Sequence, residues 1–211
     1  MQPESKLSAI QQAARWVFMQ HGYAAASMDQ VAARAVVSKA TVYTYFASKQ
    51  ELFAAIIAAE SERYAGSLGQ QIAMQGELRP RLLRLGRAIL DLLLDDETIA
   101  VYRMVMAEAG RIPALGQTFH SNGPAQLLVR LERFFAAAMR AGQLRAADAR
   151  HAAEQFVGLI RGDLQLRALL GVAADLTAQS RNAVVRSGVD TFCRSYQQSA
   201  QVAAPRRVRA A

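Results

Sequence analysis

Residues 27–49 read SMDQVAARAVVSKATVYTYFASK, and this stretch contains two short helical patterns separated by a tight break. Ser27 is a favourable N-cap for the first pattern, whose apolar residues recur on one face as far as Ala35. Ser38 is a favourable N-cap for the second pattern, which ends near Phe46. Two short helices joined in this way predict a helix-turn-helix arrangement.

The second short helix has one apolar face and one polar face. Val42 and Phe46 lie four residues apart and are expected to face inward, which leaves Lys39, Ala40 and Tyr43 outward. In a helix-turn-helix the second helix enters the DNA major groove, where Ala40 could touch a thymine methyl and Lys39 a guanine edge or a phosphate. The expected DNA-binding residues are Ser27, Met28, Ser38, Lys39, Ala40, Thr41, Tyr43, Thr44, Tyr45 and Lys49. The alternative is that the tyrosines are half-buried packing residues and the lysines are only solvated.

The remainder of the chain also follows helical patterns. Alanine and leucine are frequent, and runs of β-branched residues are scarce, which favours an all-α chain. The expected helices cover residues 5–21, 49–74, 79–95, 97–110, 125–141, 148–171 and 175–198. Residues 111–124 contain Pro113, Gly116, Gly123 and Pro124, which predict a short helical or loop-like connection.

The charge balance favours a polyanionic partner. The chain has 25 Lys and Arg against 17 Asp and Glu, for a net charge of +8. Nucleic acid is the first candidate for such an excess, and an anionic membrane surface is the second. Cys193 is the single cysteine, so no intramolecular disulfide can form, which suits a reducing cytoplasm. Charges interrupt every apolar stretch before 18 residues, so no membrane span is expected.

Residues 10–57 closely resemble the DNA-binding region of the TetR family of bacterial regulators. The matching positions are Gly22, Tyr23, Ser27, Met28, Val31, Ala32, Val37, Ser38, Lys39, Thr41, Val42, Tyr43, Tyr45, Phe46, Lys49, Leu52 and Phe53. Two positions depart from the family pattern, because Val36 and Ala40 stand where the family usually or often has glycine. Valine resists the positive φ that such a turn requires, so the turn is expected to be strained or differently shaped.

Residues 102–124 and 141–162 resemble the C-terminal domain of the AefR-like branch of this family. The resemblance implies a DNA-binding domain over residues 1–50 and a helical domain over 51–199 that dimerises and holds a small ligand. Residues 200–211 form a basic tail without periodicity, which we expect to be disordered.

The resemblance further implies that the last two long helices pair with their copies in a homodimer. The expected interface residues are Phe156, Gly158, Leu159, Gly162, Leu166, Val185, Val189 and Phe192. These apolar stripes could equally belong to the core of one subunit.

A ligand site requires a mixture of apolar and polar side chains. The candidates are Tyr102, Arg103, Met106, Phe119, Phe135, Met139, Phe156 and Arg161, and each of them could also be an ordinary core residue. Their methionine and aromatic content favours a flat or hydrophobic effector. The three histidines lack metal-ligand spacing, so neither a metal nor another cofactor is expected.

Three other classes of function fit the sequence less well. No phosphate-binding glycine loop or nucleophile–base pattern indicates an enzyme, so no catalytic residue is assigned. A membrane-surface protein would need a basic amphipathic helix with interfacial aromatics. A non-specific nucleic-acid-binding protein remains the alternative to the favoured function, a dimeric, ligand-released repressor that binds a palindromic DNA operator.

Overall fold

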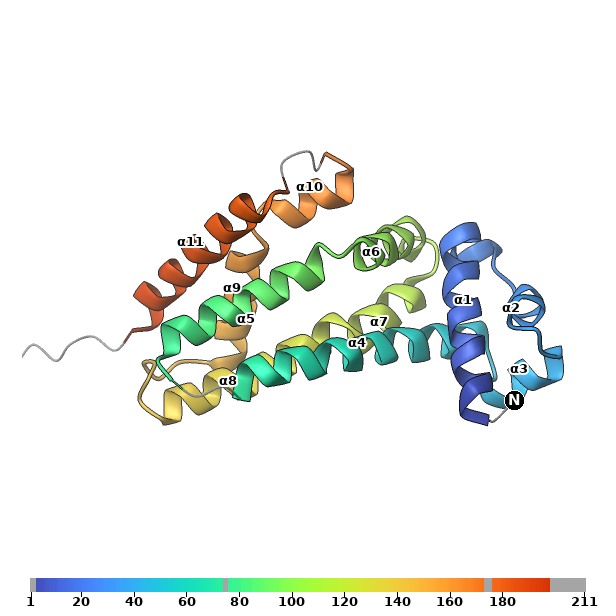
Figure 1. The fold of residues 1–211 in the computed structure, drawn as a ribbon, viewed down its shortest axis with the longest axis horizontal. Coiled ribbons are helices and arrows are strands. Elements are labelled where there is room, and N and C mark those ends of the chain that lie inside the picture. The colour runs from blue at the N-terminus through green and yellow to red at the C-terminus, as the bar shows by residue number, and fades with distance from the viewer. Residues whose placement is uncertain (1–2, 74–75, 173–175, 198–211) are drawn as a thin grey trace, which may run out of the picture.

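The computed structural model describes residues 3–73, 76–172 and 176–197, and every regular element in these ranges is an α-helix (Figure 1). The all-α prediction is therefore confirmed for the described residues. The helices are α1 (Pro3–Ala25), α2 (Met28–Ala35), α3 (Lys39–Tyr45), α4 (Lys49–Ala73), α5 (Leu78–Leu93), α6 (Asp96–Ala109), α7 (Pro113–Asn122), α8 (Pro124–Arg140), α9 (Ala149–Arg161), α10 (Leu164–Leu170) and α11 (Ala178–Tyr196).

The helices form a small N-terminal group and a larger bundle. Figure 1 shows α1, α2 and α3 together at one end, and α4 running from them along the rest of the molecule. Helices α7 and α8 lie beside α4, while α5, α9 and α11 pack together at the far end. The long helix α4 therefore joins the two groups, as the sequence predicts.

The N-terminal group has its own hydrophobic core. Val31, Val42 and Phe46 are buried there, as expected for the inward faces of the helix-turn-helix. The same core continues into Phe53 of α4 and includes Val105 of α6. Packing thus ties the first turns of α4 to the N-terminal helices, and the domain boundary at residue 50 stays a prediction.

The larger core is built around three phenylalanine rings. Phe135 of α8, Phe156 of α9 and Phe192 of α11 are fully buried, and their ring centroids lie 4.9 to 5.4 Å apart. Helices α9 and α11 approach closely at Gly188, where a Cβ atom would lie 2.9 Å from the carbonyl oxygen of Leu159. Glycine is required here because any side chain would separate the two helices.

Two segments differ from the sequence-based expectation. The single helix predicted over 148–171 is wrong, because the chain breaks at Gly162 (φ 50°, ψ −142°) into α9 and α10. Such a conformation is accessible to glycine and ends the helical hydrogen bonding. The connection at 111–124 contains a ten-residue helix, α7, with Pro113 at its first position. The expected disordered tail, residues 200–211, lies outside the described residues.

Candidate DNA-binding surface and effector cavity

Side-chain caps hold the two short helices in place. Ser27 and Gln30 form a reciprocal capping box, in which the Ser27 Oγ accepts from the Gln30 amide at 3.2 Å and the Ser27 amide donates to Gln30 Oε1 at 2.8 Å. The Ser38 Oγ accepts from the Thr41 amide at 3.1 Å. The predicted N-caps are therefore confirmed. Both serines remain exposed, so the residues that cap the two helices are also accessible to a phosphate group.

The turn between α2 and α3 contains a strained valine. Val36 has φ 55° and ψ 46°, and it is the non-glycine residue with positive φ among those described. Its amide donates to the Ala33 carbonyl at 3.3 Å, which closes the end of α2 in a left-handed cap. The left-handed conformation costs about 1–2 kcal/mol for a residue with a Cβ atom. The expected strain at this departure from the family pattern is therefore present.

Replacing Val36 with glycine is expected to stabilise the protein. Val36 is 88% exposed, so the change removes backbone strain without removing buried apolar area. Part of the gain is lost to the greater freedom of glycine in the unfolded chain, which leaves about 0.5–1 kcal/mol. Thermal unfolding measures this effect, and Val37→Gly, at a neighbouring position without positive φ, is the control that should lower the melting temperature. A lower melting temperature for Val36→Gly would contradict the strain argument.

The outward face of α3 is exposed to solvent. Lys39, Ala40, Tyr43 and Thr44 are exposed, while Val42 on the opposite face is fully buried. The Lys39 ammonium lies 2.8 Å from Asp29, and this hydrogen-bonded partner raises the pKa of Lys39. Lys39 is thus cationic and held beside the start of α2, at a surface where it can exchange Asp29 for a phosphate.

The other expected DNA-binding residues differ in exposure. Thr41 and Tyr45 are half-buried, between the exposed side of α3 and the N-terminal core. Met28 is only 7% exposed and packs in that core. Its expected place on the DNA-facing surface is corrected, because the first residue of α2 turns its side chain inward.

Lys49 is engaged within the protein. Its ammonium donates to the carbonyl oxygens of Tyr23, Ala24 and Ala26 at 2.7, 3.1 and 2.9 Å, and lies 4.6 Å from the centroid of the Tyr23 ring. Burial lowers the pKa of Lys49, while the charge of Glu108 opposes this effect. Lys49 therefore ties the end of α1 to the start of α4. A phosphate contact by Lys49 stays a prediction, and it would require giving up these bonds.

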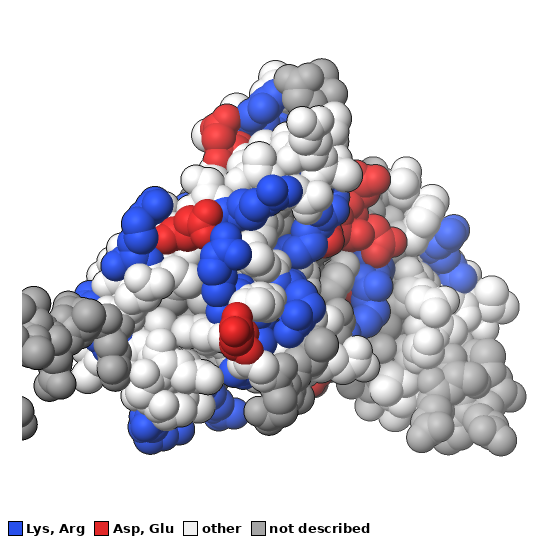
Figure 2. Space-filling model, turned by 60° about the vertical axis from the view of Figure 1, so that its left-hand side comes forward, with Lys and Arg blue, Asp and Glu red and all other residues white. Residues whose placement is uncertain are grey.

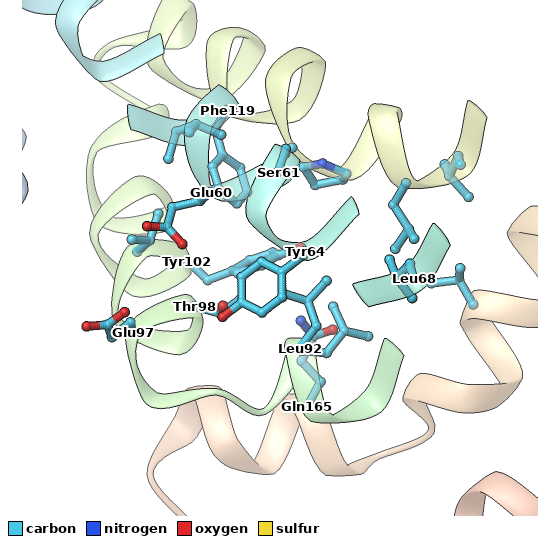
Figure 3. Close-up of a pocket in the computed structure, with 18 of the residues that line it drawn as sticks. Glu60, Ser61, Tyr64, Leu68, Leu92, Glu97, Thr98, Tyr102, Phe119 and Gln165 are labelled. Carbon is cyan, nitrogen blue, oxygen red and sulfur yellow. The ribbon is translucent and has the colours of Figure 1, made fainter. Parts of the chain in front are cut away.

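A cavity of about 270 Å³ lies in the larger bundle (Figure 3). Aromatic side chains from three helices line it: Tyr64 of α4, Tyr102 of α6 and Phe119 of α7. The other lining residues are Arg15, Ile57, Glu60, Ser61, Leu68, Leu92, Leu93, Glu97, Thr98, Val101, Gly123, Pro124, Leu127, Leu128, Arg130, Val157, Arg161 and Gln165. The wall is mainly apolar with a few polar groups, as in pockets for small organic ligands.

The sequence identifies only part of this cavity. Of the expected ligand residues, Tyr102, Phe119 and Arg161 line it. The others lie elsewhere: Arg103 donates to the Leu169 and Ala168 carbonyls at the end of α10, Met106 is 63% exposed, Phe135 and Phe156 are buried in the larger core, and Met139 packs against that core. Helical spacing on α4 was the available signal for missed residues, because positions 57, 61, 64 and 68 share one face.

Ion pairs beside the cavity join the N-terminal helices to the larger bundle. Arg15 of α1 forms ion pairs with Glu60 of α4 and Glu97 of α6, and all three residues line the cavity. Arg63 also pairs with Glu60 at 2.7 Å, but it does not line the cavity. Arg15 thus connects the first helix of the molecule to both walls of the cavity.

The expected dimer residues fall into two groups. Phe156, Val185, Val189 and Phe192 are buried within the core of one chain. Gly158, Gly162 and Leu166 are exposed, and Leu159 is half-buried. Only the second group is available to a partner subunit without rearrangement.

Basic side chains also gather far from the helix-turn-helix. Figure 2 shows Lys and Arg side chains gathered on one face of the larger bundle. Helices α5 and α11, which pack against each other, carry Arg79, Arg81, Arg84, Arg87, Arg181, Arg186 and Arg194. Net charge therefore does not by itself identify the DNA-binding surface. No described helix is both long and apolar enough to cross a membrane.

Comparison with known proteins gives the family. Residues 80–198, more than half of the chain, match the C-terminal domain of AefR-like transcriptional repressors. Residues 10–56 match the N-terminal domain of bacterial regulatory proteins of the TetR family. This chain belongs to the TetR family. The resemblance of both parts is thereby confirmed, and the interpretation as a transcriptional regulator is favoured over a non-specific nucleic-acid-binding protein.

Individual relatives agree with this assignment. The chain is 35% identical to the flavonoid-responsive regulator FrrA, with a TM-score of 0.79 over 92% of this chain and 98% of FrrA. A TetR-family regulator from Mesorhizobium loti, at 23% identity and a TM-score of 0.82, shares the fold over 94% of this chain and 100% of its own.

Two curated relatives match part of the chain. They are the transcriptional activator FasR from Mycolicibacterium smegmatis (36% identity over 40% of this chain) and the transcriptional repressor SCO4008 from Streptomyces coelicolor (40% over 26%). The matches span 38% and 29% of these relatives' own lengths.

Proposed function

We propose that this TetR-family chain is a homodimeric repressor that binds a palindromic DNA operator and is released by a small, mainly apolar effector. The exposed face of α3 carries this proposal, because Lys39, Ala40 and Tyr43 face away from the core on a capped, well-supported helix. The exposed part of α9, around Gly158 and Gly162, is the proposed contact with the second subunit. The description of the matching C-terminal domain as that of repressors supports repression over activation.

The cavity supports a compact aromatic effector. Its volume of about 270 Å³ lies near the small end of the range for ligand pockets. Tyr64, Tyr102 and Phe119 can stack on a planar ring system. The name of FrrA, a flavonoid-responsive regulator, points to the same class of molecule. Solved relatives named for fatty-acid regulation or stearoyl-CoA are 18–20% identical and support the fold alone.

Selection of bound duplexes from random DNA tests the proposed function. We expect an enriched pseudo-palindrome whose half-sites lie about 34–36 Å apart, or at a somewhat larger spacing. Flavanone added at saturation should then release the protein from this DNA. If no sequence is enriched over the starting pool, sequence-specific binding is contradicted, and the non-specific alternative gains support.

Arg15 is the proposed link between effector and DNA. A ligand in the cavity lies against Glu60 and Glu97, and any shift of α4 relative to α6 moves the two partners of Arg15. Arg15→Ala is therefore expected to keep its affinity for the operator while the effector lowers that affinity about tenfold less than in the wild type. Titrations of labelled operator with and without flavanone measure this difference.

Arg63→Ala is the matched control for Arg15. It removes an arginine that pairs with the same two glutamates but belongs to α4 and does not line the cavity. We expect its response to the effector to equal that of the wild type. If the effector lowers the operator affinity of Arg15→Ala as much as that of the wild type, Arg15 does not couple the cavity to DNA binding.

A further inference from the structure

Gln165 is an unusual residue in the cavity wall. It is 4% exposed and is the polar residue in the buried set of the described chain. Figure 3 shows its amide pointing from α10 toward the side chains that surround the cavity. Its Nε2 is buried and forms no hydrogen bond with any described group. A buried donor without an acceptor costs about 1–3 kcal/mol, so the fold retains a polar group that it does not itself satisfy.

Tyr102 places a second donor at the same end of the cavity. Its ring packs edge-on against Phe119 at 4.8 Å, which fixes its orientation. Burial raises the pKa of Tyr102, with smaller opposing effects from a hydrogen bond with the Gln165 side chain and from the Arg161 charge. The hydroxyl therefore keeps its proton at neutral pH and can donate a hydrogen bond.

The surroundings restrict what can satisfy these donors. The cavity is lined by Leu92, Leu93 and Val157 together with the aromatic rings. A polar ligand without apolar surface would lose its hydration there and gain few hydrogen bonds in exchange. A single oxygen acceptor on an otherwise apolar, planar molecule matches both the donors and the walls. Arg161, which also lines the cavity, adds a positive potential that favours partial negative charge on that oxygen.

We propose that the Gln165 amide and the Tyr102 hydroxyl form a subsite for a carbonyl oxygen of an aromatic ketone effector. The subsite rests on the proposed function only in taking this cavity as the effector site. It determines which aromatic molecules are accepted: the rings fill the apolar part, and the carbonyl oxygen fixes their orientation at the α10 end.

Flavanone and flavan test the subsite directly, because they share every ring and differ in one carbonyl oxygen. Calorimetric titration of the wild-type protein should give about tenfold tighter binding of flavanone, which corresponds to about 1.4 kcal/mol. In Gln165→Leu this ratio should fall to about twofold or less, with flavan binding retained because leucine fills a similar volume. Tyr102→Phe should lower the ratio as well while leaving the ring in place.

Gln126→Leu is the control, since it makes the same chemical change at an exposed glutamine of α8 that does not line the cavity. It should keep the wild-type ratio. A tenfold preference that persists in Gln165→Leu, no preference in the wild type, or no binding of either compound would each overturn the subsite. The subsite and the proposed function can be contradicted independently. If flavanone binds with the expected affinity ratio but does not release the operator, the proposed function alone is contradicted. If the protein binds specific DNA but does not prefer flavanone over flavan, the subsite alone is contradicted.

Discussion

Lys49→Met should lower the free energy of unfolding by about 2–4 kcal/mol, since the substitution removes three charge-assisted hydrogen bonds at once. The carbonyls of Tyr23, Ala24 and Ala26 would lose the Lys49 ammonium as their donor, and the Tyr23 ring would lose a cation. Methionine keeps the aliphatic part of the side chain, so little packing is lost. Chemical denaturation followed by circular dichroism measures the change.

Lys39→Met is the control for Lys49→Met. It makes the same chemical change at an exposed lysine with one carboxylate partner, Asp29, and should leave the stability close to that of the wild type. The pair also decides the role of Lys49 at DNA. Unchanged stability of Lys49→Met, together with a weaker salt dependence of DNA binding, would show that Lys49 is a phosphate ligand and that the bonds to α1 contribute little.

The double substitution Lys39→Ala, Tyr43→Ala should weaken operator binding about a hundredfold while helicity and dimerisation stay unchanged. Each side chain is exposed on the outward face of α3, and one lost base or phosphate contact costs about 1–3 kcal/mol. Loss of Lys39 from both subunits should also reduce the slope of log affinity against log salt concentration by about two. Fluorescence anisotropy at several salt concentrations measures both quantities.

Arg140→Ala provides the comparison for this double variant, because it removes an exposed cation at the end of α8, in the larger bundle. Its operator affinity should stay within about twofold of the wild type. Full operator affinity in the double variant would contradict the insertion of α3 into the major groove and would require a different DNA-binding surface.

The helix-turn-helix could be predicted from the sequence because its signals are local. Ser27 and Ser38 mark helix starts within a few residues, and the four-residue spacing of Val42 and Phe46 defines the inward face. The strain at Val36 is predicted by the resemblance, because valine stands where the family pattern has glycine and resists a positive φ. The break at Gly162 was missed because the apolar pattern continues from α9 into α10 across the glycine.

The cavity could be predicted only in part because it depends on packing between distant segments. Tyr64 and Gln165 come together through the arrangement of α4, α6 and α10, and neither lies in a motif. Phe135 and Phe156 have the same apolar character as Phe119, yet they fill the core, and composition does not separate the two roles. The inward direction of Lys49 likewise depends on the end of α1, far from it in sequence.

The ratio of affinities for the selected palindrome and a scrambled duplex of equal length and salt tests the central claim most directly. A capped α3 that offers base-reading side chains in both subunits should give a preference of about a thousandfold or more. Affinities equal within a few fold, both falling steeply with salt, would mean that the protein binds DNA through charge alone and would contradict the account.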